Sequence, residues 1–482
     1  MRYRLNRDSH YSPWPFSKFS CLLLFLICSF LSACNDSSNT NEQSKSSESP
    51  KASSPRGFFG EMQSSDAFTS VERNTYVELP EDHKSHPDFQ LEWWYLTFVL
   101  SGEDGQEFGL QYTLFRFNTD AASGKSTYEP VVRNWANGQQ WMGHASLHTL
   151  EHHYFEERFA NGGVGNAYVK SAPFTTVIDD WVWKATQTEP ESKATEDSKA
   201  MFPSTLTFAF GQQHTRDTNQ LPNATSKPTE EVLPRSDEAQ NGADDRALPA
   251  DTQLNNEVVP MNKAVKVALN LNSSGPFIKQ GDNGYSKKTQ DERLRSYYYS
   301  QPFINAKGTM NIEGNNIKVE GKGWFDHEWT SHLANSEALG WDWFSLHLND
   351  GSKLMAFRMH ANTNREEKSE TKNTEVFTTA SYINKNGMKE NVEQANLSIT
   401  PTGYELIQKE SKQDGKQGNE HDSSVRSVPT AWRIQLPTKN IDISVSAFKE
   451  KQWNNSLFPY FEGRVEVEGS HSGSGFMELT GY

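Results

Sequence analysis

The stretch EWWYLTFVLSGEDGQEFGLQYTLFR (92–116) has two apolar, aromatic-rich runs on either side of an Asp104-Gly105 pair. Such runs are typical of β-strands, and Asp-Gly is a preferred two-residue turn between antiparallel strands. The segment GWDWFSLHLNDGSKLMAFRMH (340–360) repeats this order of parts around Asp350-Gly351. One such hairpin is common. Two of them, each opening a strand-rich block, predict two related β domains in tandem.

Many other short runs along the chain show the period of two that strands require. Examples are NIKVEGKGWF (316–325), IDISVSAF (441–448) and GRVEVEG (463–469), and Gly, Asp and Asn turns separate such runs. Helical periodicity is scarce. The pattern therefore predicts an all-β fold built from antiparallel strands, as a sandwich or a barrel.

The predicted strands fall into two blocks. We expect an N-terminal domain over residues 76–333 and a C-terminal domain over residues 334–482, with the boundary in SHLANSEAL. Residues 187–260 and 408–428 are polar and poor in apolar side chains. Segments of this composition cannot bury enough surface to fold, so we predict that both are disordered insertions.

The first 33 residues resemble a bacterial lipoprotein signal peptide. A basic start precedes the apolar run CLLLFLICSFLSA (21–33), and Leu31-Ser32-Ala33-Cys34 resembles the lipobox. This predicts lipid on Cys34, followed by a disordered linker over residues 34–75. The expected location is the cell envelope, facing the periplasm and attached to the membrane through the N-terminal lipid. Asn35 follows Cys34 in place of the Asp that resemblance to inner-membrane lipoproteins would require, and this favours the outer membrane.

Charge and cysteine content exclude several classes of protein. The formal charge of the chain is −15 and no basic stripe is visible, which argues against a nucleic-acid partner. The chain has 3 cysteines, two of them inside the predicted signal peptide, so no disulfide is expected in the mature protein.

The stretch GKGWFDHEWTSH (321–332) is the main candidate site. On a strand, Trp324, Asp326 and Glu328 face one way, whereas Phe325, His327 and Trp329 face the other. If Asp326 lines an apolar barrel lumen, burial and the like charge of Glu328 both raise its pKa and prepare it to act as a general acid. His327 or Glu328 would hold it or activate water. Alternatively, these three residues form a polar network that fixes the domain junction.

Several other side chains are candidate ligand contacts or, equally, core residues. We predict ligand-binding roles for these aromatic and imidazole side chains: Trp94, Tyr112, His144, Trp324, Trp329, Trp341 and Trp343. His332 lies five residues after His327, which is the wrong spacing for a helical zinc motif. His144 and His148 would share one face of a strand, but we predict no metal and no cofactor. Asp326 and Glu328 also fit the carboxylate spacing of an inverting glycosidase, as would any such pair on a strand.

Five segments in order resemble the AttH-like and carotenoid 1,2-hydratase-like family. They are PDFQLEWWYLTFVL (87–100), GHASLHTLEHHYFEERFANGGVGNAYV (143–169), GKGWFDHEWTS (321–331), GWDWFSLHLNDGSKLM (340–355) and YFEGRVEVEGSHSGSGFMELTGY (460–482). The resemblance implies two tandem lipocalin-like β-barrel domains. It also implies that Asp326 stands where the proton donor of the hydratases is proposed.

Two functional hypotheses remain open at this point. In the first, the barrel binds a bulky apolar small molecule and hydrates or hydrolyses it through Asp326. In the second, the protein is a non-catalytic ligand-binding or accessory lipoprotein of an ABC-transporter system.

Overall fold

The computed structural model shows two antiparallel sheets that succeed each other along the chain. It describes seven segments of the sequence: residues 67–119, 137–186, 200–211, 265–332, 339–361, 377–408 and 425–482. The few helical residues in these segments form single 3-10 turns: Glu81–His83, Gln394–Asn396 and Pro437–Lys439.

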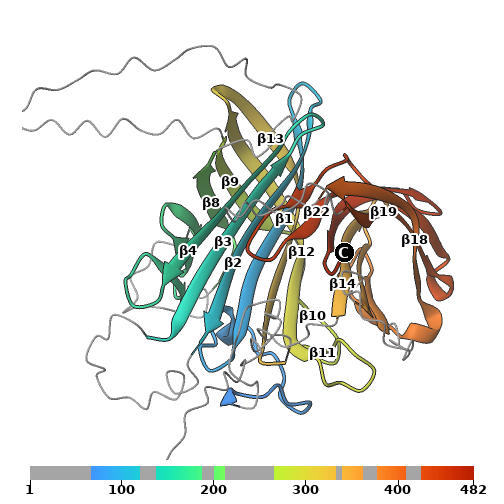
Figure 1. Ribbon diagram of the computed structural model, residues 1–482, viewed down its shortest axis with the longest axis horizontal. Helices are drawn as coiled ribbons and strands as arrows, with labels where there is room; N and C mark the ends of the chain where they lie inside the picture. Colours follow the sequence, from blue (N-terminus) through green and yellow to red (C-terminus); the bar gives the residue numbers. More distant parts are fainter. Residues whose placement is uncertain are drawn as a thin grey trace, which may run out of the picture. The chain divides into compact units, whose positions relative to one another are not determined.

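The first sheet has 13 strands, and its main path runs in the order β4-β3-β2-β1-β13-β12-β9-β8-β7-β6-β5 (Figure 1). Strands β10 and β11 pair with β12 beside this path. The strands are β1 (Leu91–Gly102), β2 (Glu107–Asn118), β3 (Gln139–His148), β4 (His153–Asn161), β5 (Ala167–Ser171), β6 (Phe174–Ile178), β7 (Trp181–Ala185), β8 (Ser204–Phe210), β9 (Val265–Ser273), β10 (Ile278–Lys279), β11 (Tyr285–Lys287), β12 (Arg295–Ile312) and β13 (Asn315–Thr330).

The second sheet has 10 strands in the order β17-β16-β15-β14-β23-β22-β20-β19-β18, with β21 paired to β22. Figure 1 shows it in orange to red, strongly curled. The strands are β14 (Leu339–Leu348), β15 (Lys353–Ala361), β16 (Phe377–Ile383), β17 (Lys389–Val392), β18 (Ser398–Gln408), β19 (Val425–Leu436), β20 (Ile441–Ala447), β21 (Trp453–Asn454), β22 (Tyr460–Gly469) and β23 (Gly473–Leu479).

Both sheets follow the same meander. The first strand of each sheet pairs with the last one, β1 with β13 and β14 with β23, and each path ends at two strands that are consecutive in sequence. This topology curls each sheet on itself, and it confirms the predicted pair of tandem lipocalin-like barrels. The two predicted hairpins are also confirmed. Gly105 and Gly351 take φ angles of 82° and 91°, which the turns require and glycine allows.

Each barrel encloses its own hydrophobic core. Strand β9 shows why: its odd-numbered residues from Val265 to Leu271 are buried and the intervening ones are exposed. Strand β20 alternates in the same way in the second barrel. A third buried cluster contains side chains from both sheets, including Trp324 and Trp343. The two barrels therefore share an apolar interface as well as having separate interiors.

The structure corrects the predicted limits of the unstructured segments. Strand β8 lies inside the range 187–260 and pairs with both β7 and β9. Its alternating sequence STLTFAF is short and lies within long polar segments, which hid the signal. Likewise, residues 425–428 begin β19. Within the predicted linker 34–75, Val71 is fully buried and its backbone N–H donates to His332.

Candidate functional site

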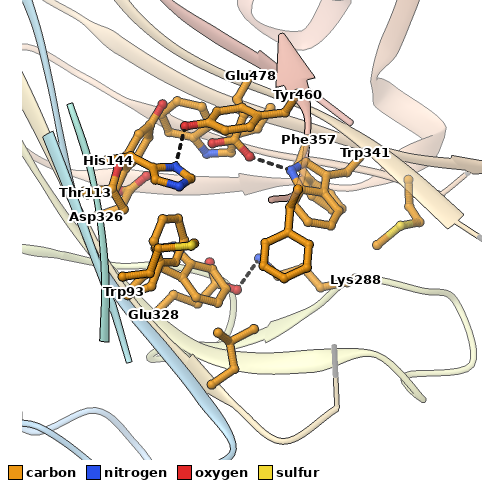
Figure 2. A pocket seen from close by; sticks show the side chains of 17 residues that line it. Trp93, Thr113, His144, Lys288, Asp326, Glu328, Trp341, Phe357, Tyr460 and Glu478 are labelled. Carbon is orange, nitrogen blue, oxygen red and sulfur yellow. Dashed lines mark hydrogen bonds and ion pairs between the residues drawn. The ribbon is translucent and has the colours of Figure 1, made fainter. Parts of the chain in front are cut away.

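A cavity lies between the two sheets and is shown in Figure 2. The cavity volume is about 90 Å³. A site for one water needs about 10–15 Å³, so the cavity has room for a small organic molecule or for one part of a larger one. The first-sheet side contributes Leu91, Trp93, Tyr95, Thr113, Phe115, Met142, His144, Lys288, Asp326 and Glu328. The second contributes Trp341, Trp343, Phe357, Met359, Phe458, Tyr460 and Glu478.

Strand β13 presents its alternate residues to two different places. Asp326 and Glu328 line the cavity between the sheets, whereas Phe325 and Trp329 belong to the core of the first barrel. The predicted alternation is therefore confirmed, but the expected location of Asp326 in a barrel lumen is wrong. Aromatic side chains fill that interior, and the second sheet supplies the other wall of the Asp326 environment.

Three donors hold the Asp326 carboxyl. Oδ1 accepts from the Ser300 hydroxyl at 2.5 Å and from the Trp324 indole N–H at 2.8 Å, and Oδ2 accepts from the Tyr298 hydroxyl at 2.9 Å. Burial nevertheless raises the pKa of Asp326 from 3.8 to about 7, and the charge of Glu328 adds to the rise. Loss of hydration thus outweighs the three hydrogen bonds, and the carboxyl can exist in either form near neutral pH.

Glu328, the second carboxylate of the motif, forms an ion pair. Its Oε1 lies 2.8 Å from the Lys288 ammonium, and both side chains are almost completely buried. The ammonium also lies 4.7 Å from the Tyr298 ring centroid and 5.0 Å from that of Phe357. A carboxylate and two ring faces together hold this buried charge.

Two further acids were not predicted: Glu478, which lines the opposite wall, and its neighbour Glu462. The two residues face each other directly across β22 and β23. The Trp341 indole donates to Glu478 Oε1 at 2.8 Å, and the Tyr95 hydroxyl donates to Glu462 Oε1. Burial raises the pKa of Glu478 to about 7, and burial together with the charge of Glu478 raises that of Glu462 well above 4.5. Alternation along β22 and β23 is the only sequence signal for this pair.

His144 contributes an imidazole to the cavity wall. Its Nδ1 lies 2.9 Å from the Tyr460 hydroxyl, and its Nε2 lies 2.8 Å from Glu157 Oε2. Burial lowers its pKa despite the neighbouring carboxylate. The histidine therefore links the first sheet to β22 as a largely neutral hydrogen-bonding group.

The predicted site residues divide between two places. Asp326, Glu328, His144, Trp341 and Trp343 line the cavity, and Trp324 lies behind Asp326 as a hydrogen-bond donor. Four others face the interior of the first barrel and do not line the cavity: Trp94, Tyr112, His327 and Trp329. Trp93 lines the cavity instead of the predicted Trp94, because adjacent residues on a strand face opposite ways.

His327 belongs to a second buried cluster centred on Glu92. One carboxylate oxygen of Glu92 accepts from His86 at 2.7 Å and from His327 at 2.9 Å, and the other accepts from Arg116 at 2.8 Å. The ligand atoms of His86, Glu92 and His327 lie within 4.8 Å of one another, so these residues could hold a metal ion. A cation there would sit beside the Arg116 guanidinium, which favours a hydrogen-bond network over a metal site.

Two predictions for the N-terminus cannot be placed. The proposed signal peptide and Cys34 lie outside the residues that the structure describes. Among the residues that it does describe, no helix has the length and apolar character needed to cross a membrane.

Comparisons with known proteins match this chain to one family and to solved structures. The AttH-like family model matches residues 70–214 and 198–482. The crystal structure of a candidate AttH from Nitrosomonas europaea is 23% identical, with 86% of this chain and 99% of that chain covered and a TM-score of 0.57. Kievitone hydratase from Nectria haematococca is 12% identical, with 86% and 96% covered and a TM-score of 0.49. A search of curated proteins finds no match.

We predict that Asp326→Asn changes how stability depends on pH. Because the pKa of Asp326 is about 7 in the folded protein and near 3.8 when unfolded, its contribution to stability is complete below about pH 4 and is lost as pH rises to about 7. The neutral variant avoids this loss, so its advantage over wild type should grow by about 2–4 kcal/mol between those limits. Denaturant unfolding at a series of pH values measures it.

The matched control for that series is Asp442→Asn, which removes an exposed carboxylate that pairs with Arg433. It should show no gain in stability from about pH 5 to about pH 8. A constant difference between Asp326→Asn and wild type over the same range would contradict the raised pKa of Asp326.

We also predict that Glu92→Ala destabilises the protein by about 3–5 kcal/mol, because it leaves the buried Arg116 guanidinium without its counter-charge. The midpoint of thermal or denaturant unfolding measures the loss. Glu320→Ala is the control, since it breaks an exposed pair with Lys307 and should leave the midpoint unchanged. Equal effects of the two substitutions would rule out a special role for the buried cluster.

Proposed function

Because the chain belongs to the AttH-like family, we propose that its cavity binds a bulky, largely apolar small molecule and that Asp326 acts on it as a general acid. The observation that carries the proposal is the environment of Asp326. A carboxyl with a pKa of about 7 lines a largely aromatic cavity between two barrels. Strongly shifted groups in a cleft are typical of functional sites.

The chemistry that fits this environment is proton transfer followed by the addition of water. Oδ1 of Asp326 already accepts two hydrogen bonds, whereas Oδ2 accepts one, so Oδ2 is the better position for a transferable proton. In a hydration, that proton goes to one alkene carbon and the double-bond electron pair forms the new C–H bond. The aromatic rings, among them Trp93 and Trp343, stabilise the positive charge on the other carbon.

Water then completes the reaction. Its oxygen adds to the cationic carbon and its proton passes to a carboxylate, either Asp326 itself or Glu478 on the opposite wall. Glu328 is less suited because it is held by Lys288. His327, which we first expected to assist, faces the first barrel's core. In a hydrolysis, the same Asp326 proton would go to the leaving group, and water would attack the atom that it leaves.

A non-catalytic role is the second candidate function. The indole N–H of Trp343 donates to the Tyr298 hydroxyl at 3.2 Å, and that hydroxyl donates to Asp326. Asp326 is thereby part of a hydrogen-bond chain that joins the two sheets. The same geometry suits a ligand-binding or accessory protein of an ABC-transporter system, in which these residues would only shape the cavity.

The proposed location follows from the sequence. We place the protein in the cell envelope, facing the periplasm, with lipid on Cys34 as its membrane attachment and the outer membrane as the favoured one. The lipobox-like Leu31-Ser32-Ala33-Cys34 and the polar segment after it support this. A lipid-anchored protein would meet apolar molecules at the membrane surface.

Native mass spectrometry of the protein purified from its own host should detect a bound apolar molecule. Met359→Trp places a larger side chain in the cavity wall and should remove that molecule. Met388→Trp is the matched control, because Met388 is 65% exposed, and it should retain the molecule. Wild-type protein that carries nothing, and that binds nothing from a lipid extract, would overturn the proposal.

Asp326→Asn separates the two candidate functions once that molecule is known. If Asp326 is the general acid, turnover should fall by about 10²–10⁴-fold while the dissociation constant changes little. Chromatography of the products and a binding titration measure the two quantities on the same samples. Equal turnover by both proteins would exclude acid catalysis by Asp326, and an absence of turnover by wild type would favour the accessory role.

A further inference from the structure

Acidic groups outnumber basic ones around the cavity. Three carboxyls line it, those of Asp326, Glu328 and Glu478, but Lys288 is the only Lys or Arg among the described lining residues. Lys288 is already paired with Glu328. Asp326 and Glu478 therefore have no cationic partner in the cavity wall.

A further acid, Glu462, lies next to the second-sheet wall without lining the cavity itself. Glu462 is fully buried and lies directly opposite Glu478 in the pairing of β22 with β23. Directly opposed carboxylates repel each other if both are ionised. Two tyrosine hydroxyls, those of Tyr95 and Tyr460, hydrogen-bond to the Glu462 carboxyl. Two adjacent acids therefore lie at this wall, and no Lys or Arg of the described residues lines it; the nearby Arg464 is paired with Glu107 and Glu466.

Lys288 shows how the same cavity accommodates a positive charge. Its ammonium is held by one carboxylate and by the faces of Tyr298 and Phe357. The opposite wall has the same kinds of group, a carboxyl and aromatic rings, but no ammonium. Glu478 lies there with the aromatic side chains of Trp341 and Tyr460, as Figure 2 shows.

We infer that the ligand of this cavity carries an organic ammonium group, bound at Glu478 beside the rings of Trp341 and Tyr460 and next to the second acid, Glu462. This inference rests on the proposed function, because it specifies the polar part of the largely apolar molecule. An ammonium would supply the missing counter-charge to the two acids, and the rings would add cation–π attraction. The rest of the ligand would contact the apolar wall around Met142 and Met359.

Other ligands fit this wall less well. A hard metal cation such as Ca²⁺ needs six to eight oxygen ligands, whereas this wall is mostly aromatic. A neutral apolar molecule would leave the acids buried without a counter-charge, so it would bind best when both are protonated. An ammonium would bind best when one of them is ionised. The two ligand classes therefore have opposite dependence on pH.

Two probes of the same shape test this difference. Benzyltrimethylammonium carries a permanent charge, and neopentylbenzene has a carbon atom in place of the nitrogen. Titrations of the full chain, followed by tryptophan fluorescence, should be made at about pH 5.5 and about pH 8.5. The ammonium should bind about tenfold more tightly at the higher pH, since its binding favours loss of a carboxyl proton. The hydrocarbon should bind equally or more weakly there.

Variants then locate the effect. Glu478→Gln and Glu462→Gln should each reduce the pH dependence of ammonium binding and leave hydrocarbon binding at about pH 5.5 unchanged. Glu468→Gln, at an exposed position of the same strand β22, should behave like wild type. If either buried variant fails to fold, the pH dependence of ammonium and hydrocarbon binding to wild type still tests the inference.

The outcomes separate the two levels of the proposal. Binding of the hydrocarbon as tight as that of the ammonium at about pH 8.5 would overturn the ammonium inference but support the apolar cavity. Ammonium binding without pH dependence would also overturn it. If neither probe binds at either pH, the inference fails together with the binding function on which it rests.

Discussion

The alternation of side chains along β13 is the constraint on which the rest of the structure depends. Successive residues of a strand point to opposite faces, so one short segment serves two environments. Phe325 and Trp329 complete the first barrel's core, and His327 joins the Glu92 cluster there. Asp326 and Glu328 face the second sheet. Moving the register by one residue would exchange these sets and place two carboxyls inside an aromatic core.

Burial between the barrels governs the chemistry of that second face. Neither sheet alone would enclose Asp326, because its surroundings combine Tyr298 and Trp324 from one sheet with Trp343 from the other. Loss of hydration at the interface outweighs the hydrogen bonds that the acids gain there. The pKa values of Asp326 and Glu478 are therefore raised. Asp326 can therefore be both a link in the interface and a reactive group. The two roles need the same contacts.

Local patterns predicted the local parts of this structure well. The Asp-Gly hairpins, the tandem β domains and the two faces of residues 324–329 follow from turn chemistry and strand period. Strand β8 was not predicted, because its short alternating pattern is surrounded by polar sequence. The acidic pair of Glu462 and Glu478 could not be predicted, because no local signal says which face of one sheet packs on another. For the same reason the sequence does not show that Trp93, and not Trp94, lines the cavity.

The pairing of first and last strands in each barrel also affects how the chain folds. Leu91 pairs with Thr330, so the first sheet closes only when distant parts of the sequence meet. Contacts of such long range slow folding, because chain entropy is lost before they form. The entropy of closing a loop grows only slowly, by about 0.6 kcal/mol for each doubling of its length. Longer connections between the strands of such a sheet therefore cost little equilibrium stability and act mainly on the rate of closure.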